Sequence, residues 1–211
     1  MPTLTTIGLF TIAALVLLLT PGPAVLYILA RSVNQGRRAG LVSVTGLATG
    51  TLIQVLAAAL GLSALVLSSA LAFHALQYLG AAYLIYLGVR KLLSKPELAD
   101  TAAVAPRKLS QVFAQGIVVN VLNPKLGLFF LAFLPQFVDL HRGSAPAQML
   151  FLGLLFVALA LCTDGSYALL AGTLGGWLKR STRFLKAQHY VTGGVYVGLG
   201  VLTAVAGVQR E

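Results

Sequence analysis

The chain has 211 residues, of which 58% are hydrophobic and only 9% are charged. That composition excludes an ordinary soluble domain, which needs about 25% charged residues, and predicts an integral membrane protein. The formal net charge of +10 raises the question of nucleic-acid binding, but no aromatic residues alternate with the charges to form a stacking surface. We therefore expect no nucleic-acid partner.

Six apolar runs are near or above the length, about 20 residues, that a helix needs to cross a bilayer. The predicted fold class is an all-α integral membrane protein with six transmembrane helices. The first run has no preceding Lys or Arg, so we expect it to be a retained helix and not a signal peptide. The runs cover residues 4–30, 41–67, 71–93, 111–138, 146–174 and 188–208.

Twelve of the fifteen Lys and Arg residues fall on one side of this topology. They lie in the loops after the first, third and fifth runs, beginning with Arg31, Arg37 and Arg38 after the first. By the positive-inside rule these loops are cytoplasmic and both termini lie outside. We expect the basic loops to contact anionic lipid headgroups.

Proline motifs interrupt two of the runs. The first run contains Thr20-Pro21-Gly22-Pro23, and the fourth contains Asn123-Pro124-Lys125. In each motif a good N-cap residue, Thr20 or Asn123, precedes a Pro that fits the first helical position because its missing N–H would be unpaired there. We predict that a helix stops and restarts at each motif. The free N–H groups and the positive dipole end of a restart suit an anion such as a carboxylate.

A stripe of small residues marks the second run. Gly46, Gly50, Gln54 and Ala58 recur at intervals of four, which places them on one helical face. Small residues at this spacing allow close helix packing, so we expect the stripe to face another helix. Gln54 then lies inside the bundle, where its amide either forms an interhelical hydrogen bond or contacts a substrate.

The two halves of the chain look related. Residues 94–110 are predicted to form a cytoplasmic linker between two three-helix repeats, residues 1–93 and 111–211, within one membrane domain. A shift of 103 positions places Pro21 on Pro124. Because each half has an odd number of spans, the second enters the membrane in the opposite sense, which predicts an inverted repeat.

Asp164 is an ionisable residue within the fifth run. Such a residue costs roughly 2.5 to 3.5 kcal/mol to insert at the bilayer centre and usually has a function. At a rise of 1.5 Å per residue, Pro21, Pro124, Gln54 and Asp164 all fall near mid-membrane. We expect a zwitterion site there, with the carboxylate at a helix restart and the ammonium near Asp164 or freed carbonyls. A proton would compete for Asp164.

Structural interpretations stay open for the same residues. In one alternative, Asp164 forms a structural pair with Lys125 and has no role in transport. In another, the long Lys125 side chain extends to the membrane interface. Proline in a membrane helix is also commonly a tolerated kink. The three histidines are too scattered for a metal site, and we expect no cofactor.

The chain resembles the LysE/RhtB family of amino-acid exporters. The resemblance is carried by the two proline motifs, by Leu26-Tyr27, by the run from Phe129 to Phe137 and by Gly80-Ala81-Ala82-Tyr83-Leu84 before a basic loop. It implies six spans, a bacterial inner membrane with periplasmic termini, an inverted repeat, a homodimer, and amino-acid efflux coupled to the proton gradient.

These arguments define the candidate site. Asp164 is assigned to proton coupling. Gln54 stands where many members of the family have His, and because Gln cannot titrate, more of the coupling would depend on Asp164. Substrate binding is assigned to Thr20, Pro21, Gly22, Pro23, Asn123, Pro124, Lys125 and Gln54.

The predicted function is a secondary transporter that exports an amino acid or related small zwitterion, with protons flowing inward. One alternative is an intramembrane enzyme, but the spans contain no nucleophile with a base, no paired carboxylates and no metal triad. A purely structural membrane subunit is another alternative, and it leaves the buried acid and the two breaks without a purpose.

Overall fold

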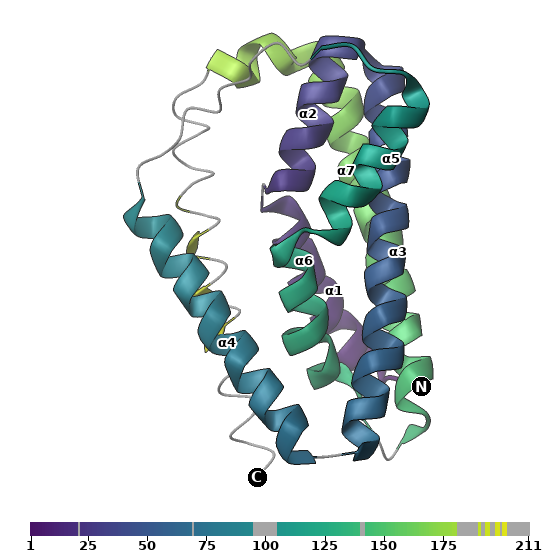
Figure 1. Cartoon of the computed structure of the whole chain (residues 1–211), viewed down its shortest axis with the longest axis vertical. Coiled ribbons are helices and arrows are strands. Elements are labelled where there is room, and N and C mark those ends of the chain that lie inside the picture. Colours follow the sequence, from purple (N-terminus) through teal and green to yellow (C-terminus); the bar gives the residue numbers. More distant parts are fainter. Residues whose placement is uncertain are drawn as a thin grey trace.

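The structure is a computed structural model that describes residues 1–20, 22–68, 70–94, 105–139 and 142–180, and residues 190, 193, 194, 197, 198, 200 and 201. Within these residues the fold is entirely helical, which confirms the all-α part of the predicted class (Figure 1). The elements are α1 (Leu4–Leu19), α2 (Pro23–Gln35), α3 (Arg37–Ser68), α4 (Ala70–Leu93), α5 (Leu109–Val121), α6 (Pro124–Leu128), the π-helical η1 (Phe129–Phe133), the 3₁₀ turn η2 (Leu134–Phe137) and α7 (Ala145–Arg180).

Two helices are long and apolar enough to span a membrane, within α3 (Arg37–Gly61) and α7 (Ala145–Ala171). Two bent pairs also qualify: α1 with α2 at 52°, and α5 with Pro124–Phe137 at 45°. The described residues thus hold two to four candidate spans. Most of the predicted sixth run and of the linker lies outside them, so the six spans and the inverted repeat stay predictions.

The chain runs back and forth between two ends of the bundle (Figure 1). We call one the basic end, because Arg37, Arg38, Arg107 and Lys108 lie where α2 turns into α3 and where α5 begins. The N-terminus and the start of α7 lie at the other, which we call the distal end. Both helix breaks lie between the two ends, at middle depth.

The break between α5 and α6 has the predicted geometry. Asn123 is the N-cap of α6, and its side-chain oxygen accepts a hydrogen bond of 3.1 Å from the backbone N–H of Lys125. Pro124 occupies the first helical position. This capping role of Asn123 is confirmed.

At the other break the predicted N-cap is wrong. α2 begins at Pro23 with Gly22 as its N-cap, whereas Thr20 is the C-cap of α1 and its hydroxyl donates to Val16 O at 2.6 Å. A residue before proline is disfavoured in the α region, and Gly22 is extended (φ −147°, ψ −168°). The second proline of the motif therefore sets the helix start. Pro21 lies outside the described residues.

The small-residue stripe of α3 does pack against another helix, as predicted. A Cβ added at Gly50 would lie 2.8 Å from both Asn120 Cβ and Ile117 O on α5. Gly116 lies on the facing side of α5. A Cβ added at Gly116 would lie 3.2 Å from the Cα of Gly46. Only residues without side chains allow this close approach of two helix backbones.

An aromatic cluster fills the bundle between its middle and the distal end. Its rings come from α1, the α6–η2 segment and α7, and neighbouring ring centroids lie 5.1 to 5.9 Å apart, a spacing typical of favourable aromatic pairs. The cluster contains Phe10, Phe129, Phe130, Phe133, Phe137 and Phe156.

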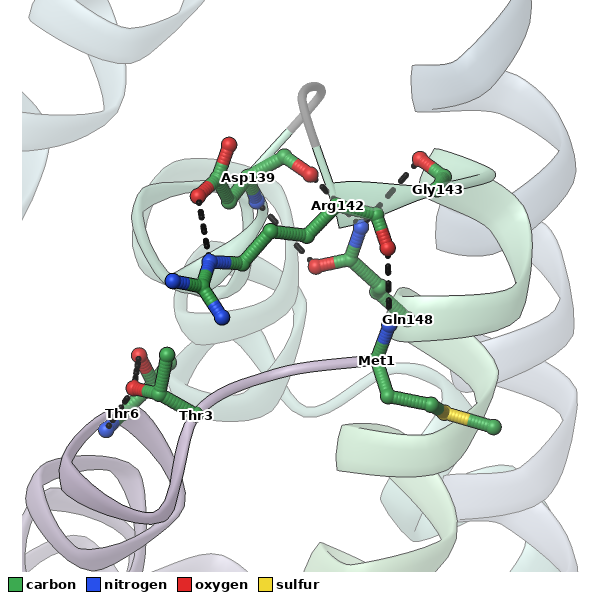
Figure 2. Close-up of polar contacts among 7 residues, drawn as sticks. All are labelled: Met1, Thr3, Thr6, Asp139, Arg142, Gly143 and Gln148. Carbon is green, nitrogen blue, oxygen red and sulfur yellow. Dashed lines mark hydrogen bonds and ion pairs between the residues drawn. The ribbon is translucent and has the colours of Figure 1, made fainter.

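Polar contacts fasten the turn that precedes α7 at the distal end (Figure 2). The Gln148 amide donates to Asp139 O at 2.7 Å and accepts from the Asp139 N–H at 3.1 Å. The Met1 ammonium donates to Arg142 O at 2.8 Å, and Arg142 Nε forms an ion pair with Asp139 at 3.3 Å. These contacts hold the N-terminus against the start of α7.

Candidate functional site

A cavity of about 30 Å³ lies where the two helix breaks meet. That volume accommodates one or two water molecules and is too small for an amino acid, so a substrate enters only if the surrounding helices move apart. Its wall is apolar apart from a few polar residues. It is lined by Leu17, Leu18, Gly22, Ala24, Val25, Thr51, Asn120, Asn123, Lys125, Leu126, Phe156, Ala160 and Asp164.

Lys125 turns inward from the start of α6. Its side chain is only 6% exposed, and its ammonium donates hydrogen bonds to Leu17 O and Thr20 O at the C-terminal end of α1. A cation is favourable there because the carbonyls of a helix C-terminus carry partial negative charge. Lys125 therefore crosses from one helix break to the other and does not extend to the membrane interface.

Other side chains complete the coverage of the α1 C-terminus. The last carbonyls of a helix lack the partner that a further helical turn would supply. Val16 O and Leu17 O each accept from the Thr20 N–H at 3.2 Å, Val16 O also accepts from the Thr20 hydroxyl, and Leu19 O accepts from the Tyr167 hydroxyl at 3.2 Å. With the two bonds from Lys125, the carbonyls of Val16, Leu17, Leu19 and Thr20 are all hydrogen-bonded.

Asp164 lies on α7 and lines the same cavity with 8% of its side chain exposed. The charges of Asp164 and Lys125 act on each other, but no ion pair within 4.0 Å joins them. Within the described part of the chain Asp164 accepts no hydrogen bond. The predicted structural pairing of these two residues is therefore not a direct contact.

The start of α2 also borders the cavity through Gly22, Ala24 and Val25. No side chain caps this helix. Its first intrahelical hydrogen bond is the one that the Leu26 N–H donates to Gly22 O at 3.0 Å, so the N–H groups of Ala24 and Val25 before it have no acceptor within the helix. A helix N-terminus of this kind attracts anions. A Cβ added at Gly22 would lie 3.8 Å from Lys125 Nζ, so the cation and this helix start are adjacent.

Gln54 takes the part of an interhelical hydrogen-bond donor. Its amide nitrogen donates to Asn120 O at 2.8 Å and to Val121 O at 2.9 Å, at the C-terminal end of α5, where Asn120 O also accepts from the Asn123 N–H at 3.1 Å. The described residues that line the cavity do not include Gln54. Its amide oxygen is buried without a hydrogen-bond partner.

Asn120 and Tyr167 also belong to this region, although neither was among the predicted site residues. Asn120 is 2% exposed and donates to Leu47 O at 2.7 Å and to the Thr51 hydroxyl at 2.6 Å. Spacing offered a signal for both, because Asn120 precedes Asn123 by three residues and Tyr167 follows Asp164 by three, which places each pair on one helical face.

A network of polar residues, which we call the basic-end network, joins α2 to α5 and the segment before it. Arg31 was predicted to lie in a basic loop, but it belongs to α2, is 1% exposed and donates to Gln35 Oε1 at 2.7 Å and Gln115 Oε1 at 2.8 Å. Arg31 also donates to Ala105 O at 3.3 Å, and Gln35 donates to Arg107 O at 2.8 Å. This network holds the end of α2 against the start of α5 at the basic end.

Comparison with known proteins decides the family. The model of the LysE type translocator family matches residues 15–207. The chain belongs to the LysE type translocator family. The match spans both proline motifs and Asp164, and it confirms the resemblance that those residues predicted.

Relatives in several bacteria match almost over their full length. A membrane protein of Vibrio cholerae is 32% identical over 93% of this chain and 95% of its own. The homoserine/homoserine lactone efflux protein of Salmonella typhimurium is 30% identical, with the same coverage. The leucine efflux protein of Salmonella choleraesuis is 26% identical over 92% of each chain.

No solved structure matches the chain significantly. The family and its named members are translocators and efflux proteins and not enzymes, which confirms that part of the prediction. Among the described residues no group of three His, Cys, Asp or Glu is placed to hold a metal ion.

Proposed function

We propose that this membrane protein is a secondary exporter of an amino acid or related small zwitterion, coupled to proton influx. The observation that carries the proposal is the cavity between the two helix breaks, which holds one cation, Lys125, and one acid, Asp164, inside an apolar wall. Discontinuous helices that expose backbone groups at middle depth are the usual substrate sites of secondary transporters. The efflux activities named for two relatives support the direction of transport.

A zwitterion has matching partners in this cavity. Its carboxylate is suited to the N-terminus of α2 at Gly22. Its ammonium is suited to Asp164 or to the C-terminal carbonyls of α1. Thr20 and Asn123 complete the two breaks, while Pro23 and Pro124 act by shaping them. Gln54 acts by holding the end of α5.

Asp164 is the acid that we assign to proton coupling. It is buried, borders the cavity and accepts no hydrogen bond within the described residues. An acid in this position is free to exchange a proton with the cavity, and intramembrane acids commonly serve as proton relays. Protonation of Asp164 would remove its attraction for the substrate ammonium and favour release.

Each end of the bundle is assigned a gate. The basic-end network joins α2 to α5 and the segment before it at one end, and the aromatic cluster reaches the cavity wall at Phe156 from the other. Transport then requires each gate to open in turn. We infer that the protein crosses a bacterial inner membrane with six spans in an inverted repeat. The basic end then faces the cytoplasm, its loops contact anionic lipid, and both termini are periplasmic. We infer further that two copies form a homodimer.

Flux through liposomes tests this function. Purified protein is reconstituted into vesicles with an imposed pH gradient, and labelled leucine, homoserine and a broad amino-acid mixture are offered. We expect gradient-driven movement of at least one amino acid, abolished by a protonophore. Equal flux into protein-free vesicles for every compound would contradict the proposal.

A further inference from the structure

The ammonium of Lys125 is the same chemical group as the α-ammonium of an amino acid. Both offer three N–H donors and one positive charge. In this structure the Lys125 ammonium lies on Leu17 O and Thr20 O at the first helix break, where Leu17 O also accepts a hydrogen bond of 3.2 Å from the Thr20 N–H. The end of α1 is therefore already arranged to hold a primary ammonium.

The Lys125 ammonium is bound by backbone carbonyl oxygens and not by a carboxylate. No carboxylate in the described part of the chain lies within 4.0 Å of Lys125. Two ionisable groups on α7 come close to this site: Asp164, which lines the cavity, and Tyr167, whose hydroxyl donates to the neighbouring Leu19 O. Asp164 is thus available to receive the Lys125 ammonium if another cation takes its place.

We propose that the C-terminal carbonyls of α1 are the ammonium subsite of the transporter, and that Lys125 occupies this subsite as a tethered competitor until the substrate displaces it toward Asp164. The inference rests on the proposed function and names the part of the site that recognises the substrate ammonium. Neither arrangement leaves an ammonium without a partner, because the substrate ammonium replaces Lys125 on Leu17 O and Thr20 O while Lys125 gains an acid.

The subsite selects a class of ligand. Its oxygens accept hydrogen bonds, so a bound cation must carry N–H donors. A primary ammonium satisfies them, whereas a trimethylated ammonium of the same charge does not. Amino acids with a free α-ammonium should therefore bind, and their N-trimethylated betaines should not.

Chemical rescue tests the subsite without transport. Lys125→Ala removes the side chain beyond Cβ, and n-propylammonium supplies the missing carbons and the ammonium. We expect millimolar n-propylammonium to raise the thermal unfolding midpoint of detergent-purified Lys125→Ala by several degrees, with no change for wild type. Tetramethylammonium, at equal charge, should have no effect on either. A folded variant that n-propylammonium stabilises no more than tetramethylammonium does would overturn the proposal.

Lys125→Met provides a second test that keeps the side-chain volume. Without the tethered competitor, we expect the Kd of the exported amino acid to fall roughly tenfold or more. If Lys125 instead bound the substrate carboxylate, the Kd would rise, and that result would overturn the proposal. Wild-type flux is a separate readout. If wild type moves no amino acid, the proposed function fails, whereas working wild type with a higher Kd in the variant defeats only the subsite.

Discussion

The Lys125 ammonium at the start of α6 donates to Leu17 O and Thr20 O at the end of α1, so one helix break is bonded directly to the other. The contact joins residues 108 and 105 positions apart. A buried lysine is costly unless its donors are satisfied, and the exposed end of a broken helix is costly unless its carbonyls are. Each break therefore stabilises the other, and any movement that separates them must replace these bonds.

Asp164→Asn should abolish proton-driven flux and leave the fold intact. The amide has nearly the same shape as the acid but neither carries the charge nor titrates between pH 5 and 8. The measurement is pH-gradient-driven uptake of the exported amino acid into liposomes, with exchange at equal pH as its companion. A variant that accumulates substrate at the parental rate would remove Asp164 from the coupling.

Gln54→Leu should destabilise the protein by about 1 kcal/mol or more, because the two hydrogen bonds that tie α3 to the end of α5 are lost. Thermal unfolding in detergent measures the effect. Thr45→Ala is the control, since this exposed residue on the same helix bonds only to its own backbone, at Val42 O. Equal unfolding midpoints for the two variants would show that Gln54 does not hold the break.

Gly50→Ala and Gly61→Ala should shift stability in opposite directions. A Cβ at Gly50 would lie 2.8 Å from Ile117 O, a backbone atom of α5, so the helices must separate. A Cβ at Gly61 meets nothing within 4 Å, and Ala is favoured over Gly in a helix by about 0.5 to 1 kcal/mol. Unfolding midpoints give the comparison. A Gly50→Ala protein as stable as Gly61→Ala would contradict the close α3–α5 packing.

Locking the basic end should stop transport reversibly. Gln35→Cys with Arg107→Cys, in a Cys162→Ser background that removes the single native cysteine, places two thiols where the Gln35 side chain now reaches Arg107 O at 2.8 Å. A short reducible thiol-specific cross-linker should halt flux, and a reductant should restore it. The two single-cysteine proteins treated in the same way are the controls. Full flux in the cross-linked protein would mean that this end need not open.

Local chemistry explains what the sequence predicted correctly. Asn123 and Pro124 form a helix start from adjacent residues, so the motif alone specifies the break. The same reasoning failed at Thr20 because two prolines compete, and the extended conformation of Gly22 before Pro23 decides between them. The apolar runs were long enough to indicate a membrane protein with no knowledge of packing.

Contacts between distant elements could not be predicted in this way. The orientation of Lys125 depends on where α1 ends in space, and the partners of Gln54 belong to α5, more than sixty residues later. Arg31 looked like a loop residue because a charge ends an apolar run, yet α2 continues to Gln35 and buries it. The depth estimate still placed both breaks and Asp164 at one level, and the cavity contains residues from all three.

An experimental structure with the exported amino acid bound tests the central claim most directly. We expect the substrate between the two helix breaks, with its ammonium on Leu17 O and Thr20 O and the Lys125 side chain turned toward Asp164. A substrate bound away from the breaks, with Lys125 still on the end of α1, would contradict the account.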